Sequence, residues 1–534
     1  MINKLLGGFV FCTMIILTLQ VSANSGLVYA ASTSGLKLDL DKPDVLVRSK
    51  SLSKLPADLL KVPLLHALLS EDFLFYYEHS EGRLGLKGTI RRIAYEHDVT
   101  FTDELIKMVL AEPADVALWR GSKGELKHYI ISISRNSLAK LFETVAKIAM
   151  DDKQLSVTGE FKLEGQAVKL YALEYGAGRR LLFTSYKDRM VVISEPAMLL
   201  NAEGAVSAKA EILLADLLGA DKQKQRRFDR VFNLDSQTRK HSIAVSTNFL
   251  FFNYQAFFPS LKAVRFDFGD QPSAGNQTWS TAMLMQGESQ QPAAMTEKTL
   301  WQSLPHQAGA CLSLPVDWRA VTGTMSSQKV AGMTTEQLTS MFGGPAALCW
   351  YAQSRLHSPL FIAQLSKTET ADKMLEDYFN YGIQQAGANE KKVRIKAQKV
   401  NAGDVVWRAE MNEDHMQPSL ARSGKLVYFS PDGILVDRAL EVVHKRQPAL
   451  SDRWKWDVAT ANTVAMFSPE PMAQLAELEI AKSLPRHQDE LLRGAADRHL
   501  LPKLAAVKKY PPMRLEMRSP PKGTGWIELD WQPF

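Results

Sequence analysis

Cysteine is scarce in this sequence, with 3 among 534 residues, and Cys12 lies in an apolar segment close to the N-terminus. The other two, Cys311 and Cys349, lie in apolar runs typical of strands with no group of histidines nearby, so we expect no zinc site. One prediction is that both are buried free thiols, because cysteine behaves as a small hydrophobic residue. The alternative is a disulfide between neighbouring strands, which an oxidising compartment would permit.

A long basic run is also absent. Lys and Arg total 64 against 58 Asp and Glu, and the formal net charge is +6. A nucleic-acid-binding protein normally concentrates its positive charge in a stripe, so we expect no nucleic-acid partner. Hydrophobic residues make up 46% of the chain and charged residues 23%, which is typical of a globular protein and excludes intrinsic disorder.

The common catalytic and cofactor motifs are missing as well. The sequence has no Walker-type phosphate loop, no Gly-x-Ser-x-Gly nucleophile turn and no His-Glu-x-x-His helix. Two local groups of acids and histidine, Glu96-His97-Asp98 and Glu413-Asp414-His415, are interpreted as solvated surface clusters. We therefore predict a protein that is not an enzyme and that holds neither a cofactor nor a metal ion.

The N-terminus has the layout of a secretory signal peptide. Lys4 precedes an apolar segment from Leu5 to Leu19, and small residues suited to signal peptidase follow at Val21-Ser22-Ala23 and again at Ala30. We predict a signal peptide at residues 1–23, with cleavage as late as residue 30. An uncleaved anchor is the alternative, although a spanning helix needs about 20 apolar residues and this segment is shorter. No second long apolar run follows, so we expect membrane contact only through a retained signal.

Similar elements recur in the same order in the two halves of the sequence, which indicates an internal duplication. Each half has strands, then a helix beginning near Ser137 or Thr370, then further hairpins; in the second half we assign Lys425–Phe429 and Ile434–Val436 as strands. The matched strands are Asp115–Trp119 with Pro345–Trp350, His128–Ser134 with Leu360–Leu365, His241–Ser246 with Asn462–Phe467, and Val264–Phe268 with Met513–Met517.

The mixture of hairpins and helices lacks a steady strand–helix alternation, which favours an α+β fold with mainly antiparallel sheets. We predict two tandem, divergently duplicated α+β modules after the signal peptide. The first covers residues 24–290 and includes an N-terminal segment with no counterpart in the second, which covers residues 291–534. The boundary falls near Gly287–Glu297, where the sequence is polar, contains proline and shows no periodicity.

Several segments of the chain resemble the YfaA-like family of uncharacterised bacterial envelope proteins. The resemblance extends over the mature chain and is most specific in its first hundred residues. It implies an exported protein of a Gram-negative bacterium, located in the periplasm or, if the signal is retained, anchored in the inner membrane and facing the periplasm. The segments that carry it are Leu38–Asp44, Leu52–Pro56, Val62–Leu65, Gly88–His97 and Val116–Arg120.

The family is a domain of unknown function, so the resemblance implies no catalytic residues. It does imply a partner. Members of the family are often encoded near a bacterial α2-macroglobulin-like protein, which implies a shared envelope role in handling foreign proteases. We therefore predict a non-enzymatic interaction protein with an envelope protein as partner. The candidate interaction segment lies within Gly85–His97, which mixes charged and aromatic residues and is unmatched in the second half: Arg91, Arg92, Tyr95, Glu96 and His97.

Two alternatives remain open. A hydrolase with a site between the modules would bring together at least two of Glu96, His97, Asp98, Asp414 and His415. A small-ligand or glycan binder would instead have an apolar cleft rimmed by aromatic side chains: Trp119, Trp350 or Trp407.

Overall fold

The structure is a computed structural model of the whole chain. It describes residues 38–62, 111–121, 126–134, 155–175, 179–201, 204–219, 227–234, 239–250, 258, 260–273, 277–285, 298–316, 318, 335–368, 371–386, 394–399, 403–410, 417–454, 463–483, 494, 497–498, 501–517 and 524–534.

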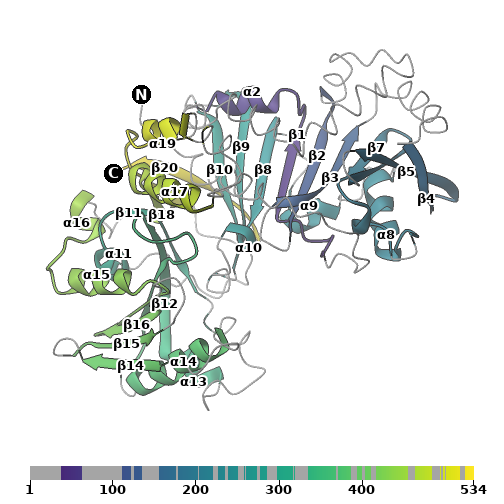
Figure 1. Cartoon of the computed structure of the whole chain (residues 1–534). Helices are drawn as coiled ribbons and strands as arrows, with labels where there is room; N and C mark the ends of the chain where they lie inside the picture. Colours follow the sequence, from purple (N-terminus) through teal and green to yellow (C-terminus); the bar gives the residue numbers. More distant parts are fainter. Residues whose placement is uncertain are drawn as a thin grey trace.

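In the described part of the chain, 20 strands form one antiparallel sheet (Figure 1). The first half of the chain supplies β1 (Val45–Ser49), β2 (Ala114–Arg120), β3 (Leu126–Ser134), β4 (Leu155–Leu163), β5 (Gln166–Tyr175), β6 (Arg179–Tyr186), β7 (Arg189–Ile193), β8 (His241–Ser246), β9 (Leu261–Ser273) and β10 (Gln277–Met285). The second half supplies β11 (Ala308–Pro315), β12 (Phe342–Tyr351), β13 (Leu360–Leu365), β14 (Arg394–Lys399), β15 (Val405–Glu410), β16 (Ser419–Ser423), β17 (Leu426–Ser430), β18 (Thr463–Phe467), β19 (Met513–Met517) and β20 (Gly525–Pro533).

The order of the strands across the sheet is the same in the two halves. Pairing in the first half gives β4-β5-β6-β7-β3-β2-β1-β8-β9-β10. Pairing in the second half gives β14-β15-β16-β17-β13-β12-β11-β18-β19-β20, which is the first order with ten added to each number. Every pair is antiparallel, so the predicted α+β class with mainly antiparallel pairing is confirmed.

The two halves meet where their last strands pair. β10 and β20 run antiparallel, with Thr281 opposite Leu529 and Leu284 opposite Trp526. The β10–β20 pairing merges the described strands of both halves into a single sheet.

Helices cover parts of both faces of the sheet. The predicted helix near Thr370 is confirmed as a helix that starts at Ala371, whereas the one predicted from Ser137 lies outside the described residues. The helices are α2 (Leu55–Leu60), α8 (Ala208–Leu218), α9 (Arg227–Phe232), α10 (Thr247–Leu250), α11 (Lys298–Ser303), α13 (Thr335–Met341), α14 (Ala371–Ala386), α15 (Gly433–Val443), α16 (Leu450–Trp454), α17 (Pro469–Ser483) and α19 (Leu501–Val507), with a short 3-10 helix at Pro196–Met198.

The strand predicted at Ile434–Val436 is wrong, because these residues form the first turn of α15. The Asp432 side chain caps this helix by accepting a hydrogen bond from the Ile434 backbone N–H. The apolar run then continues at helical spacing, and its buried residues pack on β16 and β17. A run of three apolar residues alone does not distinguish a strand from a helix.

The largest core cluster draws side chains from both halves. Trp279 of β10 and Trp531 of β20 are both buried there, with ring centroids 6.1 Å apart, and the indole N–H of Trp531 donates to Thr281 Oγ1 at 2.7 Å. Helices α2, α10, α17 and α19 add apolar residues to the same cluster. On the opposite face, α8 and α9 cover the first half, and α11 and α15 cover the second. The two halves therefore share a hydrophobic core as well as a sheet.

Candidate functional site

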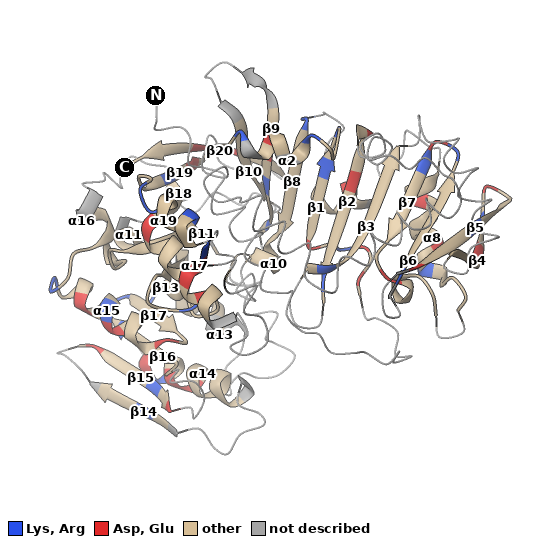
Figure 2. Cartoon of the chain, turned by 45° about the horizontal axis from the view of Figure 1, so that its top comes forward, with Lys and Arg blue, Asp and Glu red and all other residues tan. Residues whose placement is uncertain are grey.

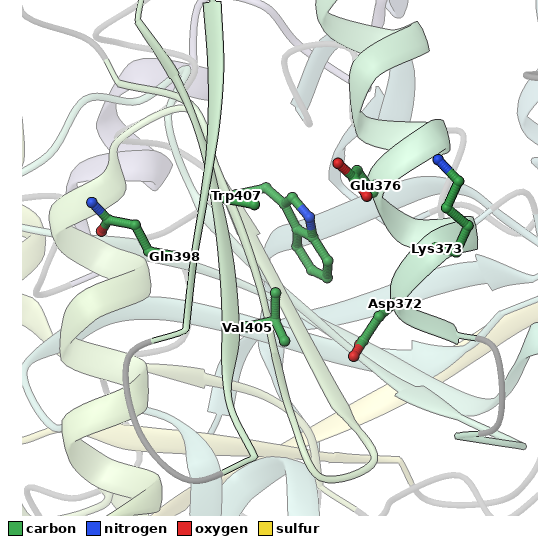
Figure 3. Close-up of a pocket in the computed structure, with 7 residues that line it drawn as sticks. Asp372, Lys373, Glu376, Gln398, Val405 and Trp407 are labelled. Carbon is green, nitrogen blue, oxygen red and sulfur yellow. The ribbon is translucent and has the colours of Figure 1, made fainter.

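A hollow of about 300 Å³ lies between α14 and the outer strands β14 and β15 (Figure 3). This volume is at the lower end of the range of ligand pockets. The first two turns of α14 supply its polar side, and the side chains of Val405 and Trp407, two residues apart on β15, share the face of the sheet toward α14. The residues lining the hollow are Asp372, Lys373, Glu376, Ala397, Gln398, Val405 and Trp407.

Most of the polar groups around this hollow already have partners or point elsewhere. Arg422 of β16 donates from Nη2 to Asp372 Oδ2 at 2.9 Å and from Nε to the other oxygen, and these hydrogen bonds raise the pKa of Arg422. Lys373 Nζ bonds to Asp377 Oδ1 at 2.9 Å. Figure 3 shows the side chain of Gln398 on the far side of its strand, so Glu376 is the main polar group that faces Trp407.

A Ser–His–Asp chain of hydrogen bonds lies elsewhere and joins α2, which packs on β9, to β8 and β1. Ser49 Oγ is 2.8 Å from His241 Nδ1, and His241 Nε2 is 3.0 Å from Asp58 Oδ2. Register places Ser49 directly opposite His241. Gly269, at φ +86, allows the close approach, because a Cβ there would lie 2.7 Å from His241 Cδ2. These residue types match a hydrolytic triad.

Burial prevents this Ser–His–Asp cluster from reaching a substrate. The exposed fractions of Ser49, His241 and Asp58 are 2%, 0% and 3%. Ser49 Oγ also accepts a hydrogen bond from the backbone N–H of Ser51 at 3.0 Å. Lys240 and Lys61 add ion pairs to Asp58 at 2.5 Å and 2.6 Å. We interpret the cluster as a structural network that fastens α2 to the sheet. Sequence reasoning missed it, because its members lie 183 and 192 residues apart.

Asp58 makes the stability of this network depend on pH. Burial raises the pKa of Asp58, but hydrogen bonds from Lys240, Lys61 and His241 outweigh this effect and hold the pKa below its usual range. A carboxyl group with a depressed pKa stabilises the fold fully above its unfolded-state pKa of about 3.9 and loses that contribution as the pH falls below it.

We expect Asp58→Asn to lower the free energy of unfolding by roughly 2 kcal/mol at neutral pH, because the amide accepts weaker hydrogen bonds from the two lysines. The difference from the unmodified protein should shrink as the pH falls below about 4. Urea unfolding of both proteins over a pH series measures this difference. A difference that stays constant down to acidic pH would show that the ionisation of Asp58 contributes nothing to the free energy of unfolding.

A disulfide joins Cys311 of β11 to Cys349 of β12. The two residues are directly opposite in the register, their Cα atoms are 4.1 Å apart, and both side chains are buried. At the corresponding place in the first half, Leu46 of β1 lies opposite Ala117 of β2. Because an apolar pair fills that position in the first half, side-chain packing alone can hold these two strands together. The disulfide adds a covalent link between the strands in the second half.

The residues predicted for an interaction site fall outside the described part of the chain. This applies to Arg91, Arg92, Tyr95, Glu96 and His97, to the neighbouring Asp98, and to Asp414 and His415.

The tryptophans predicted to rim a cleft are core residues. Trp119 and Trp350 are buried, and their indole N–H groups donate to the backbone oxygens of Asp39 at 3.0 Å and Leu356 at 2.8 Å. The prediction is therefore wrong for these two. Trp407 does line the hollow, but it is 1% exposed and belongs to a core cluster, so it does not form an open aromatic rim.

Among the described residues, no group of three His, Cys, Asp or Glu side chains is arranged to hold a metal ion. Within the same part of the chain, no helix is both long and apolar enough to cross a membrane. Positive and negative residues are interspersed over both halves (Figure 2), in keeping with the small net charge of the sequence.

Comparison with known proteins identifies relatives along almost the whole chain. The chain is 33% identical over 535 residues to the uncharacterized protein YfaA of Escherichia coli (strain K12), covering 94% of this chain and 92% of that protein. Two crystal forms of TP0453 show a weak structural similarity, with 12% and 13% identity, coverage of 48% and 49% of this chain and of 81% and 83% of theirs, and a TM-score of 0.22 for both. A family model described as an uncharacterized protein conserved in bacteria, DUF2138, matches residues 4–531. The predicted resemblance to YfaA-like proteins is confirmed, and the chain belongs to the DUF2138 family of uncharacterized bacterial proteins.

Proposed function

We propose that this protein is an exported, periplasmic interaction protein of the cell envelope, without catalytic activity of its own. The observation that carries the proposal is the disulfide between Cys311 and Cys349. Disulfides persist in oxidising compartments and are rare in the cytosol, where thiols are kept reduced. The apolar N-terminal segment, which has the layout of a secretory signal, supports the same location.

The protein arose, in this proposal, by duplication of one α+β module. Ten described strands in the first half and ten in the second follow the same order, with two crossovers of the same kind in each half. The shared core around Trp279 and Trp531 holds the modules as one body. A long sheet with a shared core suits a protein that presents surfaces to a partner.

Binding rather than catalysis is supported by the chemistry of the described residues. The Ser49–His241–Asp58 cluster is sealed from solvent, and the hollow beside α14 offers Glu376 with no nucleophile near it. An α2-macroglobulin-like envelope protein is the proposed partner through family association, with Arg91, Arg92, Tyr95, Glu96 and His97 as its proposed contact segment.

In-cell photo-crosslinking tests the proposed partner. A photoreactive amino acid at Tyr95 should give an adduct with the α2-macroglobulin-like protein, identified by mass spectrometry. The control position is Ile212, an exposed residue of α8 that should give no such adduct. Equal adducts at both positions, or an adduct at neither, would contradict the proposed contact segment.

A small-ligand site is the second candidate function, favoured by the hollow beside Trp407. The carboxylate of Glu376 would suit a small polar ligand with a positive charge. Small amines titrated into the protein in a calorimeter should then bind; Glu376→Gln should abolish this binding, and Glu211→Gln on α8 should leave it unchanged.

A further inference from the structure

In the part of the chain that the structure describes, no strand pairs with the outer edge of β4. β4 is the last strand at the first-module end of the sheet (Figure 1), and β5 is its one partner among the described strands. An edge strand presents a row of backbone N–H and C=O groups that can pair with another chain.

The regular part of this edge is short and well defined. The register with β5 shifts between Val157 and Gly159, which marks a bulge. After Leu163 the chain enters the hairpin turn at Glu164 and Gly165, with φ of 51 and 79. The bulge and the turn leave a regular stretch from Gly159 to Leu163, with Phe161 at its centre.

The two charged residues of this stretch have opposite signs and lie one on each side of Phe161. Glu160 and Lys162 are exposed, and neither forms an ion pair or side-chain hydrogen bond in the described part of the chain. Phe161 and Leu163 belong instead to the core cluster beneath α8. Glu160 and Lys162 therefore share the other face of β4, on either side of its central residue.

We propose that two copies of the chain pair antiparallel through Gly159–Leu163, about a two-fold axis at Phe161. Residues 160 and 162 are equidistant from this axis, so Glu160 of each copy lies opposite Lys162 of the other. Opposite charges directly across two strands stabilise the pairing, and the symmetry provides the contact twice. This inference concerns self-association and does not rest on the proposed envelope partner.

The other end of the sheet does not offer an equivalent contact. β14, the edge strand of the second module, has the sequence Arg-Ile-Lys-Ala-Gln-Lys, with three cationic residues and no acidic one. Pairing of two such strands brings like charges together. Association should therefore stop at a closed dimer instead of continuing into a filament. Because the paired stretch is short, we expect the dimer to be weak.

Sedimentation velocity of the mature chain from about 1 to about 200 µM tests the proposal by following the monomer–dimer equilibrium. E160K and K162E should each raise the dimer dissociation constant about tenfold, because each places two pairs of like charges across the axis. An equal mixture of the two variants should recover the original affinity, since every lysine then faces a glutamate. The double variant E160K/K162E should also recover it.

A matched control is K425E in the turn between β16 and β17, which changes an exposed lysine on neither edge strand and should leave association unchanged. Circular dichroism and thermal unfolding show whether each variant is folded. A chain that stays monomeric throughout the concentration range would overturn the proposal. Single variants that dimerise normally would also overturn it, as would a mixture that fails to recover the affinity. In either case the edge of β4 would be a site for a strand of another protein.

Discussion

Removing the disulfide between Cys311 and Cys349 should lower the free energy of unfolding of the second module by about 4 kcal/mol. The bond closes a loop with a sequence separation of 38, and in the chain-entropy account a cross-link restricts the unfolded chain more as the loop lengthens. The double variant Cys311→Ala/Cys349→Ala isolates this effect, because the Leu46–Ala117 pair shows that the first module accommodates apolar side chains at the corresponding position.

Urea unfolding with and without reductant measures the contribution of the disulfide. Reductant should lower the unfolding midpoint of the unmodified protein and have no effect on the double alanine variant. The midpoint is the appropriate quantity, because a chain of two modules need not unfold in a single step. An unmodified protein whose midpoint does not respond to reductant would show that the bond contributes nothing to stability.

Glu479→Ala should lower the free energy of unfolding by about 3–5 kcal/mol, because it removes a buried carboxylate that accepts hydrogen bonds from the Arg355 side chain and the Leu356 backbone. Glu479 lies on α17 and is 7% exposed. Arg355 donates to it from Nε at 2.5 Å and from Nη2 at 3.0 Å, and the backbone N–H of Leu356 donates to the same carboxylate at 3.2 Å. These contacts fasten α17 to the chain between β12 and β13.

Asp377→Ala provides the matched control for Glu479→Ala. It breaks the ion pair with Lys373, whose side chain is 73% exposed, and should change the free energy of unfolding by less than about 0.5 kcal/mol. Chemical unfolding followed by far-ultraviolet circular dichroism compares the two variants. Equal effects of the two substitutions would show that burial does not strengthen the Arg355–Glu479 pair.

The antiparallel strands could be predicted from the sequence where their pattern was distinct. Met513–Met517 alternates buried and partly buried residues, and Thr463–Phe467 is a continuous buried run between two covered faces. The strand predicted at Ile434–Val436 failed because tertiary contacts and the Asp432 cap select a helix there. Local pattern thus identifies strands well where it persists for five residues or more.

Long-range pairings could not be predicted in the same way. The sequence matched Val264–Phe268 with Met513–Met517, but it gave no sign that the strands following them, β10 and β20, pair with each other. The Ser49–His241–Asp58 cluster likewise depends on the register of β1 with β8. Trp119 and Trp350 were expected at a cleft because sequence does not show that helices and neighbouring chain cover both faces of β2 and β12.

Intact mass spectrometry without reductant, on protein isolated from the periplasmic fraction of its own cells, tests the central claim most directly. We predict a chain that begins after Ala23, or at the latest after Ala30, and that lacks two hydrogen atoms because Cys311 and Cys349 are joined. A chain that begins at Met1, is recovered from the cytosol and carries both thiols free would contradict it.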